Sequence, residues 1–122
     1  MKLVICEKPS VGAAVAAALG VTGKKDGYIE NDKYIISWCI GHLVQLSEAA
    51  AYGEQYRKWS YDSLPILPQE WQYTVAADKG KQFKILKDLM HRADVSEVVN
   101  ACDAGREGEL IFRFVYHQAG CK

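Results

Sequence analysis

The sequence predicts an α/β domain built on a mainly parallel β-sheet. Two apolar runs without polar alternation, residues 2–6 and 94–102, are typical of strands buried on both faces. Each run is followed by a segment with the periodicity or composition of a helix. Alternation of strand and helix at both ends of a chain indicates a parallel sheet covered by helices. The 122 residues suffice for one domain.

The first strand-like run leads through a charged segment into an alanine-rich helix. We expect Ser10 to be the N-cap of this helix and Gly20 to end it. Turn signals at 25–27 and 31–32 then flank "GYIE" and "KYIISWCIG", which predicts a β-hairpin.

Residues 47–73 change character. A short helix is expected at 47–52, followed by an irregular but ordered segment over 53–73, because disordered linkers lack so many aromatic residues. The aromatic residues of this region include Trp59, Tyr61, Trp71 and Tyr73. Aromatic side chains can stack on nucleic-acid bases, but we expect these four to cover a core instead. Together with the hairpin, this region forms a predicted β-hairpin and irregular insertion at about 24–75.

The last third of the chain returns to regular structure. A helix begins near Asp78, a second buried strand covers 94–102, and a second amphipathic helix covers 105–120. The predicted buried face of the first helix is Phe83, Leu86, Leu89 and Met90, and that of the second is Leu110, Ile111, Phe114 and Val115. A parallel sheet usually continues beyond such a helix, so we expect the chain to be the N-terminal fragment of a longer protein.

Composition gives weaker indications of function. The chain has 15 basic and 15 acidic residues, so a nucleic-acid partner would have to be recognised by local placement of charge. The four cysteines occur singly, without a CxxC pair, which disfavours a zinc site and favours reduced thiols. No signal peptide and no membrane-length apolar run are present, so we expect a cytoplasmic protein without a membrane partner.

Acidic residues follow both predicted parallel strands. Ligands of open α/β sheets bind outside the carboxyl ends of the strands. Glu7 follows the first strand, Asp103 follows the second, and Glu107 lies four residues later near a helix start. If the strands are neighbours, these carboxylates form a cluster of hard oxygen donors suited to Mg²⁺.

A simpler interpretation of these acids is structural. Asp103 could cap the next helix, and acids in a first helical turn complement the helix dipole. Gly105 and Gly108, which would let the backbone approach a ligand closely, favour the metal site. Glu109 lies further along the helix, and we assign it the structural role.

Basic residues and one histidine accompany the acids. Lys8 and Arg106 either pair with the neighbouring carboxylates or hold a phosphate beside the metal, and without a ligand we expect internal pairing. His42 follows a predicted strand and a glycine. Because no nucleophile or acid adjoins it in the sequence, we expect a structural hydrogen-bonding role.

Two motifs resemble a known family. "LVICEKPSVG" and "ACDAGREGELI" are similar to the two halves of a Toprim domain, and more narrowly to the opening of a bacterial type IA DNA topoisomerase of the topoisomerase III kind. "GHL" at 41–43, "W…LPILP" at 59–68 and "DKGKQFKILKDLM" at 78–90 fit the same subfamily. The resemblance covers residues 1–122. It implies a Rossmann-like parallel sheet with helices on both faces.

The resemblance also implies roles for individual residues. Glu7 matches the glutamate that donates or accepts a proton at the scissile phosphate, and Lys8 matches a lysine that stabilises phosphate charge. Asp103 and Glu107 match the first and last acids of an Asp-x-Asp-x-Glu motif that binds Mg²⁺, with Glu7 or water completing the metal shell.

Arg106 matches the arginine inside that motif. The departure is Gly105, which stands where the family has the second aspartate.

Type IA enzymes cleave single-stranded DNA with a tyrosine that becomes linked to the 5′ phosphate. In the family that tyrosine belongs to a later domain, so the resemblance implies that these 122 residues act with the remaining topoisomerase domains and are inactive alone. Two alternatives remain at this point. The same acids serve stand-alone Toprim nucleases and primase-type domains, and Gly105 is compatible with a degenerate, non-catalytic binding module.

Overall fold

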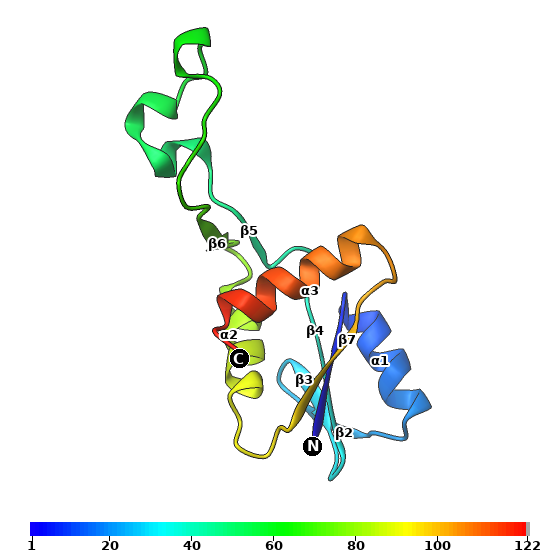
Figure 1. Ribbon diagram of the computed structural model, residues 1–122. Helices are drawn as coiled ribbons and strands as arrows, with labels where there is room; N and C mark the ends of the chain where they lie inside the picture. The colour runs from blue at the N-terminus through cyan, green and yellow to red at the C-terminus, as the bar shows by residue number, and fades with distance from the viewer. Residues whose placement is uncertain (122) are drawn as a thin grey trace.

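The computed structural model describes residues 1–121, which form a mixed α/β domain with a projecting arm (Figure 1). The main sheet has the strand order β2-β3-β4-β1-β7. Its strands are β1 (Lys2–Cys6), β2 (Gly23–Lys25), β3 (Tyr28–Glu30), β4 (Tyr34–Trp38) and β7 (Glu97–Ala101). A second sheet pairs β5 (Val44–Leu46) with β6 (Tyr73–Val75). The α-helices are α1 (Pro9–Ala18), α2 (Gly80–Met90) and α3 (Arg106–Gln118).

The main sheet is mixed, so the prediction of a mainly parallel sheet is wrong. The central strand β1 runs parallel to both of its neighbours, β4 and β7. The strand β3 is antiparallel to both β2 and β4. The predicted hairpin is confirmed, but it extends the sheet itself, and a hairpin necessarily adds antiparallel strands. The parallel part of the sheet therefore consists of β4, β1 and β7, and the residues of the predicted site follow the ends of these strands.

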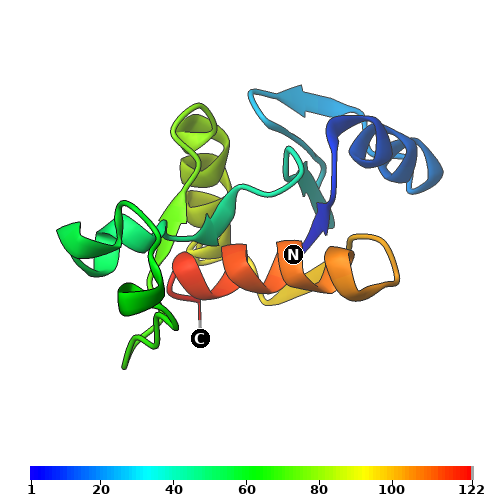
Figure 2. The ribbon, with the colours of Figure 1, turned by 90° about the horizontal axis from the view of Figure 1, so that it is seen from above.

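The helices cover both faces of the sheet, as predicted. Leu3 and Ile5 of β1 pack into a cluster with α2 and α3, whereas Val4 and Cys6 pack into a cluster with α1. Figure 2 shows α1 and α2 on opposite sides of β1. Since successive side chains of a strand point to opposite faces, an unbroken apolar run is what a central strand requires.

The other predicted parallel strand, β7, lies at an edge. Its Val98 and Val99 are only half-buried, one packing on each face of the sheet. A position beside β1 with no described strand beyond it explains why burial is partial, although the apolar run resembles that of β1.

The start of α1 differs from the prediction. The helix α1 starts at Pro9 with Lys8 as N-cap, so the prediction that Ser10 is the N-cap is wrong. Proline at the first helical position has a suitable φ and lacks an N–H that would be unpaired anyway. The predicted end of α1 is confirmed, since Gly20 follows it with φ 68°.

The buried face of α3 is rotated relative to the prediction. Ile111, Phe112 and Val115 are buried, whereas Leu110 is 36% exposed. Phe114 is half-buried and contacts Tyr73 of β6, with ring centroids 4.9 Å apart. The second sheet therefore packs on one flank of α3, a tertiary contact that helical periodicity cannot reveal.

Residues 47–72 form the arm that projects from the sheet domain (Figure 1). It contains three short 3₁₀ helices, η1 (Ala49–Tyr52), η2 (Glu54–Tyr56) and η3 (Tyr61–Ser63), which confirms an ordered irregular segment. Trp59 is 74% and Tyr61 100% exposed, so the prediction that these aromatics cover a core is wrong. No helix among residues 1–121 is long and apolar enough to cross a membrane.

Candidate functional site

The acids at the two strand ends meet at one edge of the sheet. Because β1 and β7 are parallel and adjacent, with Cys6 beside Ala101, the residues that follow both strands leave the sheet together. The Asp103 side chain lies close enough to Glu7 to be the largest influence on the pKa of the Glu7 carboxyl. Glu7 is half-buried and Asp103 is exposed. The predicted convergence of these two carboxyl groups is therefore present in the structure.

Their contact changes the acidity of Glu7. The hydrogen bond with Asp103 raises the pKa of the Glu7 carboxyl above its ordinary value, and desolvation and the Asp103 charge act in the same direction. Lys8 and His42 oppose the shift through their positive charge. Two carboxyl groups in contact cannot both ionise without cost, and a nearby cation would lower that cost.

Glu107 joins this edge from the first turn of α3. Its Oε2 lies 3.1 Å from Nε2 of His42, 65 positions away in the sequence. Gly108 explains why α3 can lie so close to the loop after β7. A Cβ at Gly108 would overlap the backbone oxygen of Asp103 and lie 2.8 Å from its backbone C and N atoms. Gly108 thus fixes the separation between Asp103 and the start of α3.

The sequence did not predict that His42 would lie at this edge and pair with Glu107. It follows β4, and β4 is parallel to β1, so its loop leaves the sheet at the same edge as Glu7. The only available signal was the position of "GHL" after a predicted strand. Which acid it would meet depends on how α3 docks, and local sequence does not encode that.

The acids do not form a ready metal site. Within residues 1–121, no three His, Cys, Asp or Glu side chains are arranged to hold a metal ion. Instead the groups form two pairs, Glu7 with Asp103 and Glu107 with His42. The donor chemistry nevertheless suits Mg²⁺, which prefers one or two carboxylates and completes its shell with water and phosphate oxygens. A cation here would offset the repulsion between the Glu7 and Asp103 carboxylates.

The two glycines of the predicted site have different roles. Gly108 is required by backbone packing, as described above. A Cβ at Gly105 would meet no atom within 4 Å, and its φ of −161° is accessible to any residue. Gly105 is the N-cap of α3, so this position has room for a side chain at the helix start. Steric demand therefore does not explain the glycine that replaces the second motif aspartate.

Lys8 and Arg106, the two basic residues of the predicted site, form no ion pair among the described residues. Both Lys8 and Arg106 are exposed, and the ion pairs recorded for residues 1–121 include neither of them. The expectation that they would pair with the neighbouring acids is wrong. Arg106 begins α3 and Lys8 precedes α1, so both cations adjoin helix N-termini, where backbone N–H groups also favour anions.

Glu109 has the structural role expected of it. One carboxylate oxygen accepts a hydrogen bond from Nδ2 of Asn100 at 2.9 Å, and the other pairs with Arg113 one helical turn later. These contacts tie α3 to β7. Both carboxylate oxygens of Glu109 are thereby engaged by Asn100 and Arg113.

The cysteines behave as small apolar residues. All four are free thiols, and Cys6 and Cys39 are fully buried. Burial, reinforced by the nearby Cys102, raises the pKa of the Cys6 thiol to about 11. A thiol that stays protonated at neutral pH is a poor metal ligand and a poor nucleophile.

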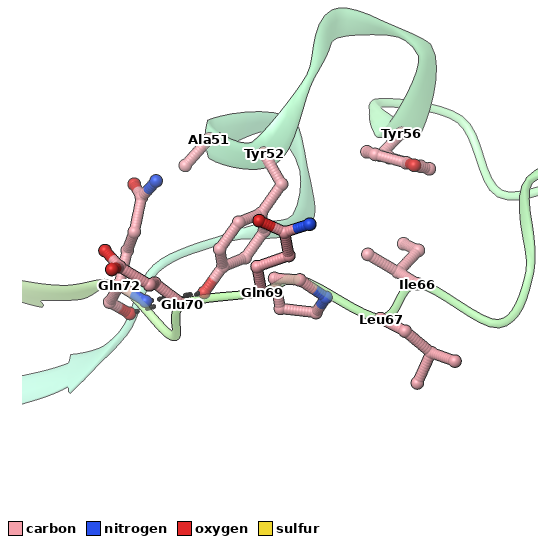
Figure 3. Close-up of a pocket in the computed structure, with 9 residues that line it drawn as sticks. Ala51, Tyr52, Tyr56, Ile66, Leu67, Gln69, Glu70 and Gln72 are labelled. Carbon is pink, nitrogen blue, oxygen red and sulfur yellow. Dashed lines mark hydrogen bonds between the residues drawn. The ribbon is translucent and has the colours of Figure 1, made fainter.

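The arm contains a separate cavity of about 370 Å³. Tyr52 lines it, and its hydroxyl accepts a hydrogen bond from the backbone N–H of Gln72 at 2.9 Å (Figure 3). Ile66 and Leu67 line the opposite side. Glu7, Asp103 and Glu107 do not line this cavity, so the chemistry of the sheet edge is independent of it.

The Glu7–Asp103 contact predicts a measurable titration. In a ¹³C NMR titration of the side-chain carboxyls, Glu7 is expected to titrate above its ordinary pKa of 4.5. Because the folded-state pKa of Glu7 is raised, the protonated Glu7 carboxyl stabilises the fold at low pH, and this stabilisation is lost as pH rises through the raised pKa. Asp103→Asn is expected to lower the Glu7 pKa, since an amide donates to the ionised carboxylate. An unchanged midpoint in that variant would contradict the contact.

Comparison with known proteins finds a domain family and several relatives that match this sequence. The Toprim domain family matches residues 2–121. A DNA topoisomerase 3 of Shouchella clausii is 45% identical over 121 residues, which is 99% of this chain and 17% of the relative. The DNA topoisomerase 3 of Staphylococcus haemolyticus is 44% identical over 93% of this chain and 16% of its own length. That of Bacillus licheniformis is 44% identical over 96% of this chain and 16% of its own length.

The chain therefore spans about one-sixth of the length of these relatives. The match to the domain family, in contrast, extends over nearly all of the described residues and includes both strand ends that carry the acids. On that basis, the chain belongs to the Toprim domain family.

Proposed function

We propose that the chain is the Toprim domain of a type IA DNA topoisomerase of the topoisomerase III kind. In this function it supplies the Mg²⁺-binding and acid/base part of single-strand DNA cleavage and rejoining. The observation that carries the proposal is the contact of Glu7 with Asp103 at the carboxyl edge of the sheet. Similarity to proteins named DNA topoisomerase 3 along almost the whole chain supports it.

Glu7 is the proposed proton donor and acceptor. Cleavage of a phosphodiester by a tyrosine expels a sugar hydroxyl, which must gain a proton as it leaves. The raised pKa of Glu7 helps the carboxyl to retain a proton for this step. In rejoining, the same carboxylate accepts the proton of the attacking hydroxyl.

Lys8 and Arg106 are the proposed phosphate-binding residues. Both are exposed and adjoin helix N-termini, Lys8 at the start of α1 and Arg106 at the start of α3. Lysine acts on phosphate as a point charge, and arginine can bind two oxygens at once. In this role they neutralise charge that develops on the phosphate during transfer.

Asp103 and Glu107 are the proposed ligands of Mg²⁺, with Glu7 or water as a further ligand. The bound ion would supply charge neutralisation at the phosphate oxygens. The fit rests on the donor set, which is made of carboxylate oxygens, together with the open space at the Gly105 position. Mg²⁺ commonly binds proteins through as few as one or two carboxylates, so the missing aspartate is compatible with metal binding.

The proposal includes partners outside the described residues. Residues 1–122 would form one Toprim domain, with an insertion at about 24–75, within a longer chain whose remaining domains carry the nucleophilic tyrosine. None of the seven tyrosines of this chain lies in the two motifs that carry the acids, residues 3–12 and 101–111. The substrate would be single-stranded DNA, and the location the bacterial cytoplasm.

Two measurements on the purified 122-residue chain test the proposal. The chain is expected to bind Mn²⁺, used as a spectroscopic substitute for Mg²⁺, and Asp103→Asn is expected to weaken that binding at least about tenfold. The chain alone is expected neither to cleave nor to relax supercoiled plasmid, because it lacks the nucleophile.

The same assays separate the alternatives. Metal-dependent nicking by the chain, lost in Glu7→Gln, would replace the proposal with a stand-alone nuclease that activates water. Equal Mn²⁺ binding by the original chain and Asp103→Asn would refute the metal site and favour a binding module. Relaxation of plasmid by the chain alone would refute the assignment of the nucleophile to another domain.

A further inference from the structure

We propose that His42 is a positioning residue for the metal ligand Glu107. In this arrangement the imidazole holds one carboxylate oxygen, and the other oxygen is left to the cation. The inference rests on the proposed metal site and assigns it a residue that the acidic motif does not contain.

The first support is the geometry of the pair. His42 Nε2 and Glu107 Oε2 are 3.1 Å apart, which is a hydrogen-bond distance. An ionised carboxylate can only accept, so Nε2 must carry the hydrogen and donate it. Only Oε2 takes part in the contact, and Oε1 has no hydrogen-bond partner among the bonds recorded for residues 1–121. Ligating carboxylates are commonly held in this way by a neighbouring donor.

The second support is the anchoring of the loop that carries His42. The loop leaves β4 and is tied to β1 by two backbone bonds, from Cys39 N to Cys6 O at 2.8 Å and from Gly41 N to Glu7 O at 3.3 Å. Lys79 Nζ donates to the carbonyl oxygen of His42 at 3.3 Å. The histidine backbone is therefore fixed relative to Glu7.

Gly41 makes this path possible. Its φ of +61° lies in the left-handed region, which glycine adopts without steric cost. The chain turns there immediately before His42, so the imidazole is presented to α3 rather than continuing along β4. One loop thus contacts both acids, Glu7 through its backbone and Glu107 through its side chain.

The exposure of the pair separates positioning from stability. The His42 and Glu107 side chains are 40% and 66% exposed. Ion pairs and hydrogen bonds between such exposed groups contribute little to the free energy of unfolding. The His42–Glu107 contact joins two elements that are distant in sequence and contributes little to stability. Such a contact is suited to orienting Glu107 as a metal ligand. Its loss is expected to change metal affinity and leave the unfolding midpoint nearly unchanged.

The test compares three substitutions of His42 in the 122-residue chain by Mn²⁺ titration, read by electron paramagnetic resonance. His42→Leu removes the donor and keeps much of the volume. His42→Asn places its amide too close to the backbone to reach Glu107. His42→Gln can place an N–H near the position of Nε2. The Leu and Asn variants are expected to raise the Kd for Mn²⁺ about tenfold, and Gln to restore most of the affinity.

Thermal unfolding of each variant without metal is the control, and all midpoints are expected to match that of the original chain. Unchanged Mn²⁺ affinity in the Leu and Asn variants would overturn the inference. So would equal losses in all three variants, because they would show that the ring matters and the donated hydrogen does not. Failure of the unsubstituted chain to bind Mn²⁺ would refute the metal site itself, an outcome distinct from the other two.

Discussion

Gly108→Ala is expected to destabilise the domain by about 3 kcal/mol, at the upper end of the usual cost of overpacking. The new Cβ would overlap the backbone oxygen of Asp103 and lie 2.8 Å from the Asp103 backbone C and N atoms. A flexible side chain could move aside at little cost, but the obstacle here is backbone. Relief requires either α3 or the loop after β7 to shift, and α3 contributes Ile111 and Val115 to the main core.

Gly105→Ala is the matched control, three residues earlier in the same segment. Its Cβ would meet no atom within 4 Å and its φ is −161°, so neither overlap nor backbone strain arises. The N-cap position prefers glycine to alanine, and a loss below about 1 kcal/mol is expected. Urea denaturation measures both variants, with the free energy of unfolding taken by linear extrapolation. Equal stability of the two variants would contradict the packing role of Gly108.

The same pair of variants links packing to metal binding. Gly108 packs against the backbone of Asp103 in the loop after β7. A shift of this loop relative to α3 would therefore also move Asp103 away from Glu107, the other proposed metal ligand. Gly108→Ala is therefore expected to bind Mn²⁺ more weakly even under conditions in which it is fully folded. Gly105→Ala should retain the affinity of the original chain.

The location of the acids could be predicted because it follows from one general rule. Strands that are parallel and adjacent present their carboxyl ends at one edge, so acids placed just after two such strands must converge. The unbroken apolar run of residues 2–6 indicated a central strand, and the structure places β1 between β4 and β7. That was sufficient to bring Glu7 and Asp103 together without knowledge of any other contact.

The remaining features depend on contacts that local sequence does not record. The hairpin was predicted, but its addition to the main sheet depends on β4 pairing with β1, and this made the sheet mixed. The partnership of His42 with Glu107 depends on the docking of α3. The burial of Phe112 rather than Leu110 depends on how α3 docks on the sheet, and the partial cover of Phe114 comes from Tyr73 of the second sheet.

The internal pairing expected for Lys8 and Arg106 failed for a physical reason. Their nearest acids already have partners, Glu7 with Asp103 and Glu107 with His42. Exposed ion pairs offset little of the entropy lost when long side chains are fixed, so both cations remain solvated. Two cations without internal partners, together with the Glu7–Asp103 pair, are what the proposed binding of a metal ion and a phosphate requires.

Gly105→Asp is expected to increase Mn²⁺ affinity on the order of tenfold to a hundredfold. The substitution adds a third carboxylate between Asp103 and Glu107, and affinity for hard cations rises with the number of charged oxygen ligands. The position has room for the side chain and accessible backbone angles. As the N-cap of α3, an aspartate there can also accept a hydrogen bond from the first-turn backbone with one oxygen.

Gly105→Asn separates the two effects, because asparagine caps a helix about as well as aspartate but adds no charge. Asparagine is therefore expected to change stability slightly without raising affinity. The aspartate variant carries additional repulsion in metal-free buffer, so its unfolding midpoint should rise more steeply with Mg²⁺ than that of the asparagine variant. Equal Mn²⁺ affinity of the two variants would show that this position does not face the cation. Asp103 and Glu107 would then have to hold the metal in a geometry that differs from that of the family motif.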